Sequence, residues 1–88
     1  MWWLIFLIVA GVTTVGIITL NAIVEAIREI ELKKRKKYIS AKIDKIYKEG
    51  NYKVVEIGLI DSLKNKEKLI LKGKEIDNSL YVKQEIPI

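Results

Sequence analysis

The clearest candidate for a binding site is a run of five consecutive basic residues: Lys33, Lys34, Arg35, Lys36 and Lys37. Such a run suits three tasks: orienting a membrane helix, contacting anionic lipid headgroups, or binding nucleic-acid phosphates. Lipid attraction contributes about 1 kcal/mol per basic residue near the surface. Nucleic-acid binding is disfavoured, because no aromatic side chains are interleaved with the basic residues and no known binding motif is present. The run therefore predicts contact with a membrane.

The groups that usually carry catalysis are missing or scattered. The chain has no histidine and no cysteine, which excludes imidazole acid–base chemistry, thiolate chemistry and the usual zinc ligands. Its serines therefore lack a histidine that would activate them. The carboxylates alternate with lysines in a way typical of a solvated face. We expect no catalytic residues, no cofactor and no metal site.

A long apolar segment precedes the basic run. Residues 1–24 carry no charged side chain, whereas the rest of the chain carries all 16 basic and all 11 acidic residues. As a helix, Trp2 to Val24 would measure roughly 35 Å, enough to cross a hydrocarbon core of roughly 30 Å. Trp2 and Trp3 suit the headgroup level at one end. We predict a transmembrane helix over residues 1–24. A cleaved signal peptide is disfavoured, because no basic side chain precedes the segment.

The basic run also predicts the orientation of this helix. Loops rich in lysine and arginine stay cytoplasmic when they lie within about 15–20 residues of the membrane. Lys33 to Lys37 fall within that distance and account for the whole net charge of +5. The sequence therefore predicts a single-pass signal-anchor protein of the cell membrane, with the N-terminus outside and the C-terminus cytoplasmic.

Small and polar residues within the predicted membrane helix suggest self-association. Ala10 and Thr14 have the four-residue spacing of small residues at helix interfaces, and Asn21 could hydrogen-bond across a helix pair. Beyond the bilayer we predict a basic juxtamembrane helix over residues 25–37. An apolar stripe with helical spacing continues from the membrane helix into it and comprises Ile23, Ala26, Ile27 and Ile30.

The pattern changes to alternation in residues 38–88, which predicts a small β domain. Alternating apolar side chains and turn residues indicate four short strands, arranged as an antiparallel meander or small open barrel. Residues 38–48 could instead extend the helix. Residues 52–61 are apolar on both faces, which predicts a covering layer from another copy, a partner or the curled sheet itself.

Two stretches, "YKVVEIGLIDS" at 52–62 and "LYVKQEIPI" at 80–88, carry a resemblance. They resemble an uncharacterised family of small bacterial and phage membrane proteins, in which a transmembrane helix leads into a short β domain. That family has a "Y-x-V-V-x-I" strand and ends in "L-x-V-G-D-x-V-x-V". Lys83 and Gln84 replace its Gly-Asp turn here. The resemblance implies the fold and adds nothing about activity, because the function of that family is unknown.

Two functions fit these predictions. The first is an anchored β domain that serves protein–protein interaction or self-association without catalysis. The alternative is a membrane-active small protein, similar to a phage holin or a toxin. A structured β domain exceeds what a lytic peptide needs, so the interaction module is favoured. The expected partners are the membrane and its anionic headgroups, together with a protein partner or a second copy.

Overall fold

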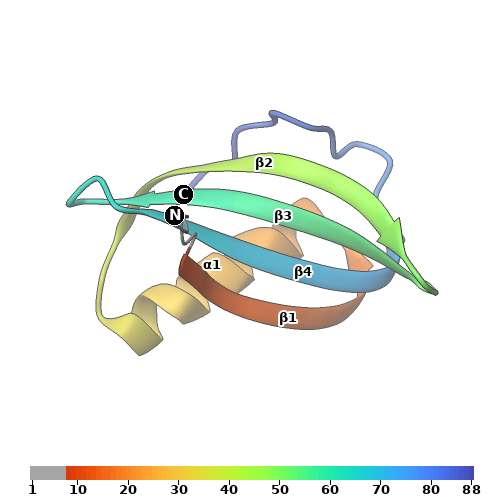
Figure 1. Ribbon diagram of the computed structural model, residues 1–88, viewed down its shortest axis with the longest axis horizontal. Helices are drawn as coiled ribbons and strands as arrows, with labels where there is room; N and C mark the ends of the chain where they lie inside the picture. The colour runs from red at the N-terminus through yellow and green to blue at the C-terminus, as the bar shows by residue number, and fades with distance from the viewer. Residues whose placement is uncertain (1–7) are drawn as a thin grey trace, which may run out of the picture.

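The computed structural model describes residues 8–88, which form one mixed sheet, one helix and an irregular C-terminal segment (Figure 1). Strands β1, β4, β3 and β2 lie side by side in that order. The helix α1 packs against one face of the sheet (Figure 1). The elements follow the chain as β1 (Ile8–Ile18), α1 (Leu20–Lys34), β2 (Tyr38–Glu49), β3 (Tyr52–Asp61) and β4 (Lys66–Ile76).

Residues 8–18 of the uncharged N-terminal segment form strand β1, where we predicted a membrane helix. Eight of its 11 residues are β-branched, which favours extended backbone. β1 runs parallel to β4, with Val12 opposite Ile70 and Thr14 opposite Lys72. Its backbone hydrogen bonds are therefore made with a neighbouring strand.

Within residues 8–88 no helix has both the length and the apolar character needed to span a bilayer. The predictions of a transmembrane helix over residues 1–24, a single-pass topology and an outside N-terminus are therefore wrong. The holin-like alternative stays an untested prediction.

The helix α1 begins at Leu20, inside the predicted transmembrane span, and ends at Lys34, short of the predicted end of the juxtamembrane helix at residue 37. The Thr19 hydroxyl accepts a hydrogen bond from the Ala22 backbone N–H at 3.0 Å, which caps the first turn. Arg35 adopts a left-handed conformation with φ of 51° and ends the helix two residues before Lys37. The predicted apolar stripe is confirmed as its buried face: Ile23, Ala26, Ile27 and Ile30.

Strands β2, β3 and β4 form the predicted antiparallel hairpins. β2 pairs with β3 from Tyr38 opposite Asp61 to Glu49 opposite Tyr52, so residues 38–48 are a strand. Gly50, with φ of 60°, forms the turn between them. The expected fourth strand over residues 80–88 is wrong, since that segment contributes only one bridge, between Glu85 and Lys42. The fourth strand is β1, so the sheet is mixed and is not a meander.

The hydrophobic core lies between α1 and the sheet face that it covers. Side chains from α1 and from all four strands reach it, and the C-terminal segment adds two more. The fully buried members are Ile18, Ile23, Ile27, Ile43, Val55, Ile57, Leu69 and Leu71, with Leu59, Leu80 and Ile86 nearly so.

Candidate interaction surfaces

Strand β1 forms an open edge of the sheet. Within residues 8–88 it pairs with β4 alone, so its outer backbone groups have no strand beside them. Natural edge strands are usually protected by charged side chains or proline, and β1 has neither. Val9, Val12 and Ile17 are 50%, 57% and 54% exposed. This edge can accept another strand.

The opposite edge, along β2, is covered by the C-terminal segment. The Ile86 backbone N–H donates to the Ala41 carbonyl at 2.8 Å, and the Lys83 N–H donates to the Ile43 carbonyl at 2.7 Å. The Ile43 N–H in turn donates to the Gln84 carbonyl at 2.9 Å. The Ile86 side chain is buried in the core. Residues 8–88 therefore close one edge of the sheet and place no strand or segment on the other.

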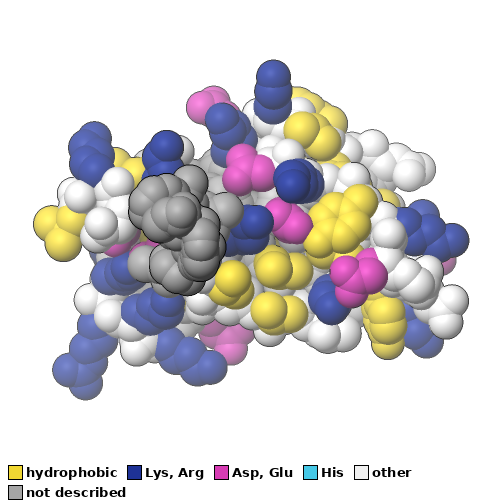
Figure 2. All heavy atoms as spheres, viewed as in Figure 1, with side chains coloured by type: hydrophobic (Ala, Val, Ile, Leu, Met, Phe, Trp, Pro, Cys, Tyr) yellow, Lys and Arg dark blue, Asp and Glu magenta, His cyan; other side chains and the backbone are white. Residues whose placement is uncertain are grey.

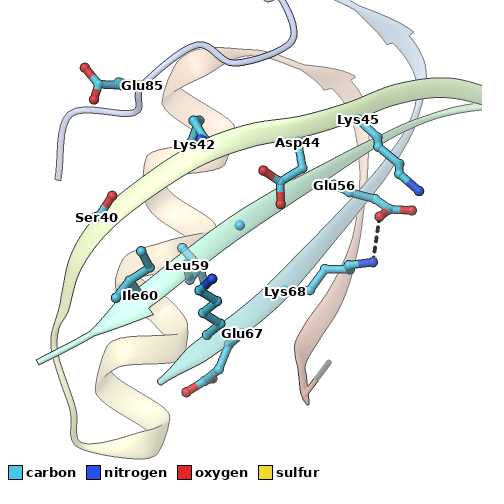
Figure 3. A pocket seen from close by; sticks show the side chains of 12 residues that line it. Ser40, Lys42, Asp44, Lys45, Glu56, Leu59, Ile60, Glu67, Lys68 and Glu85 are labelled. Carbon is cyan, nitrogen blue, oxygen red and sulfur yellow. Dashed lines mark ion pairs between the residues drawn. The ribbon is translucent and has the colours of Figure 1, made fainter. Parts of the chain in front are cut away.

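The sheet face turned away from α1 carries charged side chains of both signs, with apolar side chains between them (Figure 2). A hollow of about 500 Å³ lies over Gly58 on this face (Figure 3). Lysines and carboxylates line it in equal number: Lys42, Lys45, Lys66 and Lys68 with Asp44, Glu56, Glu67 and Glu85. The balanced charge gives the hollow no preference for an anion or a cation.

One carboxylate of this hollow is held by two partners. Lys68 Nζ lies 2.8 Å from Glu56 Oε1, and the Tyr47 hydroxyl donates to Glu56 Oε2 at 2.7 Å. These contacts with Lys68 and Tyr47 lower the pKa of Glu56 below its ordinary value. The group is therefore a stable anion at neutral pH and a poor proton acceptor.

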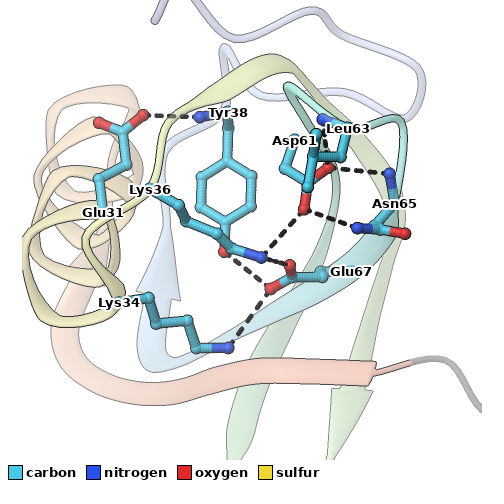
Figure 4. A network of polar contacts seen from close by, with 8 residues as sticks. All are labelled: Glu31, Lys34, Lys36, Tyr38, Asp61, Leu63, Asn65 and Glu67. Atoms are coloured by element: carbon cyan, nitrogen blue, oxygen red, sulfur yellow. Dashed lines mark hydrogen bonds and ion pairs between the residues drawn. The ribbon is translucent and has the colours of Figure 1, made fainter.

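A second polar cluster joins the end of α1 to the hairpin between β3 and β4 (Figure 4). Lys36 Nζ lies 3.0 Å from Asp61 Oδ2 and also pairs with Glu67. Lys34 Nζ is 3.3 Å from Glu67 Oε1, to which the Tyr38 hydroxyl donates at 2.8 Å. Asp61 and Glu67 are only 3% and 4% exposed. We call these five residues the lysine–carboxylate cluster.

Both buried carboxylates of the cluster remain charged. Burial raises the pKa of Asp61, but hydrogen bonds from Asn65, Lys36 and Leu63 outweigh it and lower that pKa to about 2. Burial likewise raises the pKa of Glu67, and hydrogen bonds from Lys36, Tyr38 and Lys34 leave it lowered. The same contacts with Glu67 and Asp61 raise the pKa of Lys36. The cluster is a structural clamp of fixed charges, without a group poised to exchange a proton.

The predicted basic run is divided by this cluster. Lys34 and Lys36 are engaged with buried carboxylates. Lys33, Arg35 and Lys37 are exposed, and no ion pair to them is found within residues 8–88. The sequence shows five adjacent cations, but the fold directs two of them inward.

The other predicted site residues are separated. Ala10 and Thr14 lie in β1, whereas Asn21 lies in α1, where its side-chain amide donates to Glu25 at 3.4 Å. They do not form one helix face. Trp2 and Trp3 lie outside the described residues.

Sequence reasoning missed the buried acids. We expected the carboxylates to be solvated, yet Glu56, Asp61 and Glu67 are buried. One local signal existed for Asp61, since "DSLKN" is a tight turn in which Asp61 accepts the backbone N–H groups of Leu63 and Asn65, both at 2.9 Å. No pattern indicated Glu67, because its partners lie about thirty positions away along the chain.

Within the described part of the chain, no three acidic side chains gather as metal ligands would. No protein-family model matches the chain, and neither the curated proteins nor the solved structures offer a match. The resemblance of residues 52–62 and 80–88 to an uncharacterised family stays a prediction.

Proposed function

We propose that this chain is a non-catalytic interaction module that associates with a second copy of itself by pairing strand β1 with strand β1. The contrast between the two sheet edges carries this proposal: the C-terminal segment covers β2, while β1 has no cover within residues 8–88. An open and uncharged edge is a template for another strand.

The composition of β1 favours a second copy as the partner. Each of the other three strands carries lysines and acids, and β1 alone has no charged residue. Two β1 strands can therefore pair without removing a charge from water, which would be costly. Pairing also covers the half-exposed Val9, Val12 and Ile17. Because β2 is covered in both copies, association stops at two chains.

Sedimentation velocity of the full chain tests the proposal. We expect a dimer, and we expect Thr14→Glu to weaken it by about tenfold or more, because two like charges would meet at the paired edges. Thr14 lies opposite Lys72 of β4, so the new carboxylate has a favourable neighbour and the monomer keeps its fold.

The matched control is Val82→Glu, which adds the same charge at an exposed position of the C-terminal segment. It should leave the dimer intact. A wild-type chain that sediments as a monomer at high micromolar concentration contradicts the proposal, as does equal weakening by both variants.

A further inference from the structure

A basic and partly apolar surface lies at the end of the molecule where α1 stops and the β3–β4 turn begins. The two segments are joined there: the Ser62 backbone N–H donates to the Lys37 carbonyl at 3.3 Å, and Lys36 bridges to Asp61. We call this surface the basic end. It comprises the cations Arg28, Lys33, Arg35, Lys37 and Lys64 with the two leucines Leu32 and Leu63.

Two acidic side chains of this end are hidden from the solvent, and a third, Glu31, is half-buried, with its carboxylate accepting the Tyr38 backbone N–H at 2.9 Å. Asp61 and Glu67 are buried, and Lys34 and Lys36 neutralise them within the lysine–carboxylate cluster. The five cations of the basic end are exposed, and none of them forms an ion pair with another residue of 8–88. Lysine and arginine side chains gather at this end, on the left in Figure 2. An approaching surface therefore meets positive charge.

Two leucines project from the same end. Leu32 and Leu63 are each 80% exposed, the largest exposure of any large apolar side chain among the described residues. Leu63 sits in the tight turn held by the Asp61 carboxylate, and Lys64 follows it in a left-handed conformation with φ of 69°. Leu32 borders an open hollow of about 690 Å³, which four cations and one carboxylate also line: Arg28, Arg35, Lys36, Lys37 and Glu31.

We propose that the basic end binds a surface of anionic lipid headgroups, with the cations on the phosphates and the two leucines inserted among the upper acyl carbons. Cations supply attraction over a Debye length, and an apolar side chain between them gains from leaving water. Nucleic acid offers the leucines no such environment, and no exposed aromatic side chain lies among the five cations for base stacking. The contact is peripheral and requires no segment to cross the bilayer. It is independent of the pairing of β1.

Co-sedimentation of the full chain with vesicles tests this inference. The vesicles contain either phosphatidylcholine alone or phosphatidylcholine with one anionic lipid, phosphatidylglycerol. We expect binding to the anionic vesicles to exceed binding to the neutral ones and to fall as salt is added. The triple variant Lys33→Gln/Lys37→Gln/Lys64→Asn should bind about a hundredfold more weakly, at about fivefold per cation. Asparagine is chosen at position 64 because it tolerates positive φ.

A control of equal net charge uses the opposite end of the sheet. Lys48→Gln/Lys53→Gln/Lys74→Gln removes three lysines beside the β2–β3 turn and the end of β4. We expect it to lower binding by about threefold at most, since those charges lie far from the headgroups. Equal losses in the two triple variants would overturn the inference, because they would show a response to net charge alone.

The leucines separate a lipid surface from other polyanions. Leu32→Gln/Leu63→Gln keeps every charge and should weaken vesicle binding by about tenfold or more. Both side chains are exposed, so the fold should tolerate the change, and circular dichroism checks it. Undiminished vesicle binding by this variant, together with equally tight binding of duplex DNA, would assign the basic end to nucleic acid and overturn the lipid proposal.

Discussion

Lys36 Nζ lies 3.0 Å from Asp61 Oδ2, although 25 positions of sequence separate the two residues (Figure 4). This contact ties the segment after α1 to the turn between β3 and β4. Through Glu67 the same lysine reaches the start of strand β4. One side chain thus links three parts of the chain, and its removal would leave two carboxylates buried with fewer partners.

Acid should weaken this clamp and so lower the stability of the fold. The pKa of Asp61 is about 2 in the folded chain against an ordinary value of 3.8, and that of Glu67 is also lowered. A folded-state pKa below the unfolded value gives stability that is present above about pH 4 and is lost as pH falls toward 2. Urea titrations between pH 7 and pH 2 should show this loss.

The variant Asp61→Asn isolates that contribution. It should be less stable than the wild type at pH 7, and the difference should shrink as pH falls through the range where Asp61 takes up a proton. Glu29→Gln, at an exposed helix position, is the matched control and should change stability little at any pH. A constant difference between Asp61→Asn and the wild type from pH 7 to pH 2 would contradict this linkage.

Tyr38 should ionise only at unusually high pH. Burial, followed by the hydrogen bond to Glu67, raises its pKa above the ordinary value of 10.0. A raised folded-state pKa contributes stability that is complete below about pH 10 and is lost as pH rises above it. Tyr38→Phe should cost about 1.5 kcal/mol at pH 7, since Glu67 loses one donor but keeps both lysines. In a pH titration followed by absorbance at 295 nm, the variant should lack the tyrosine ionisation step that occurs at the highest pH in the wild type. Loss of a step at lower pH would contradict the assignment to Tyr38.

The parallel pairing of β1 with β4 depends on a glycine. A Cβ added at Gly73 would come within 2.8 Å of Ile18 Cγ1 and 3.1 Å of the Val15 carbonyl oxygen. Because backbone cannot yield as a flexible side-chain tip can, Gly73→Ala should destabilise the fold by about 1–3 kcal/mol. Gly16→Ala is the control, since its Cβ would enter open space. Chemical denaturation measures both, and equal effects would indicate that β1 does not lie against β4.

The C-terminal cover of β2 should be needed for solubility as well as for stability. Ile86 is 5% exposed, and Ile86→Ala should cost about 2 kcal/mol through the cavity that it leaves. A chain ending at residue 80 should also expose the β2 edge and form assemblies larger than dimers. Light scattering detects them. If the shortened chain scatters as the wild type does, residues 81–88 do not protect that edge.

The sequence by itself determined the local features of this protein. The absence of histidine and cysteine excluded whole classes of chemistry, and the helical spacing from Ile23 to Ile30 located the buried face of α1. Alternating apolar and polar side chains, with turn residues between the runs, indicated the hairpins of β2, β3 and β4. Strands that are neighbours in sequence pair through a short turn, so local sequence is enough to predict them.

Only the tertiary structure decided what the uncharged segment and the basic run become. An uncharged stretch rich in β-branched residues can make all of its backbone hydrogen bonds either as a helix in lipid or as a strand beside β4. Which of the two forms depends on β4, whose residues lie more than fifty positions away in the sequence. Likewise, Lys36 and Lys37 are alike in sequence. Lys36 reaches Asp61 and Glu67, whereas Lys37 faces solvent. The direction of each side chain depends on where α1 ends and on which strands lie opposite it.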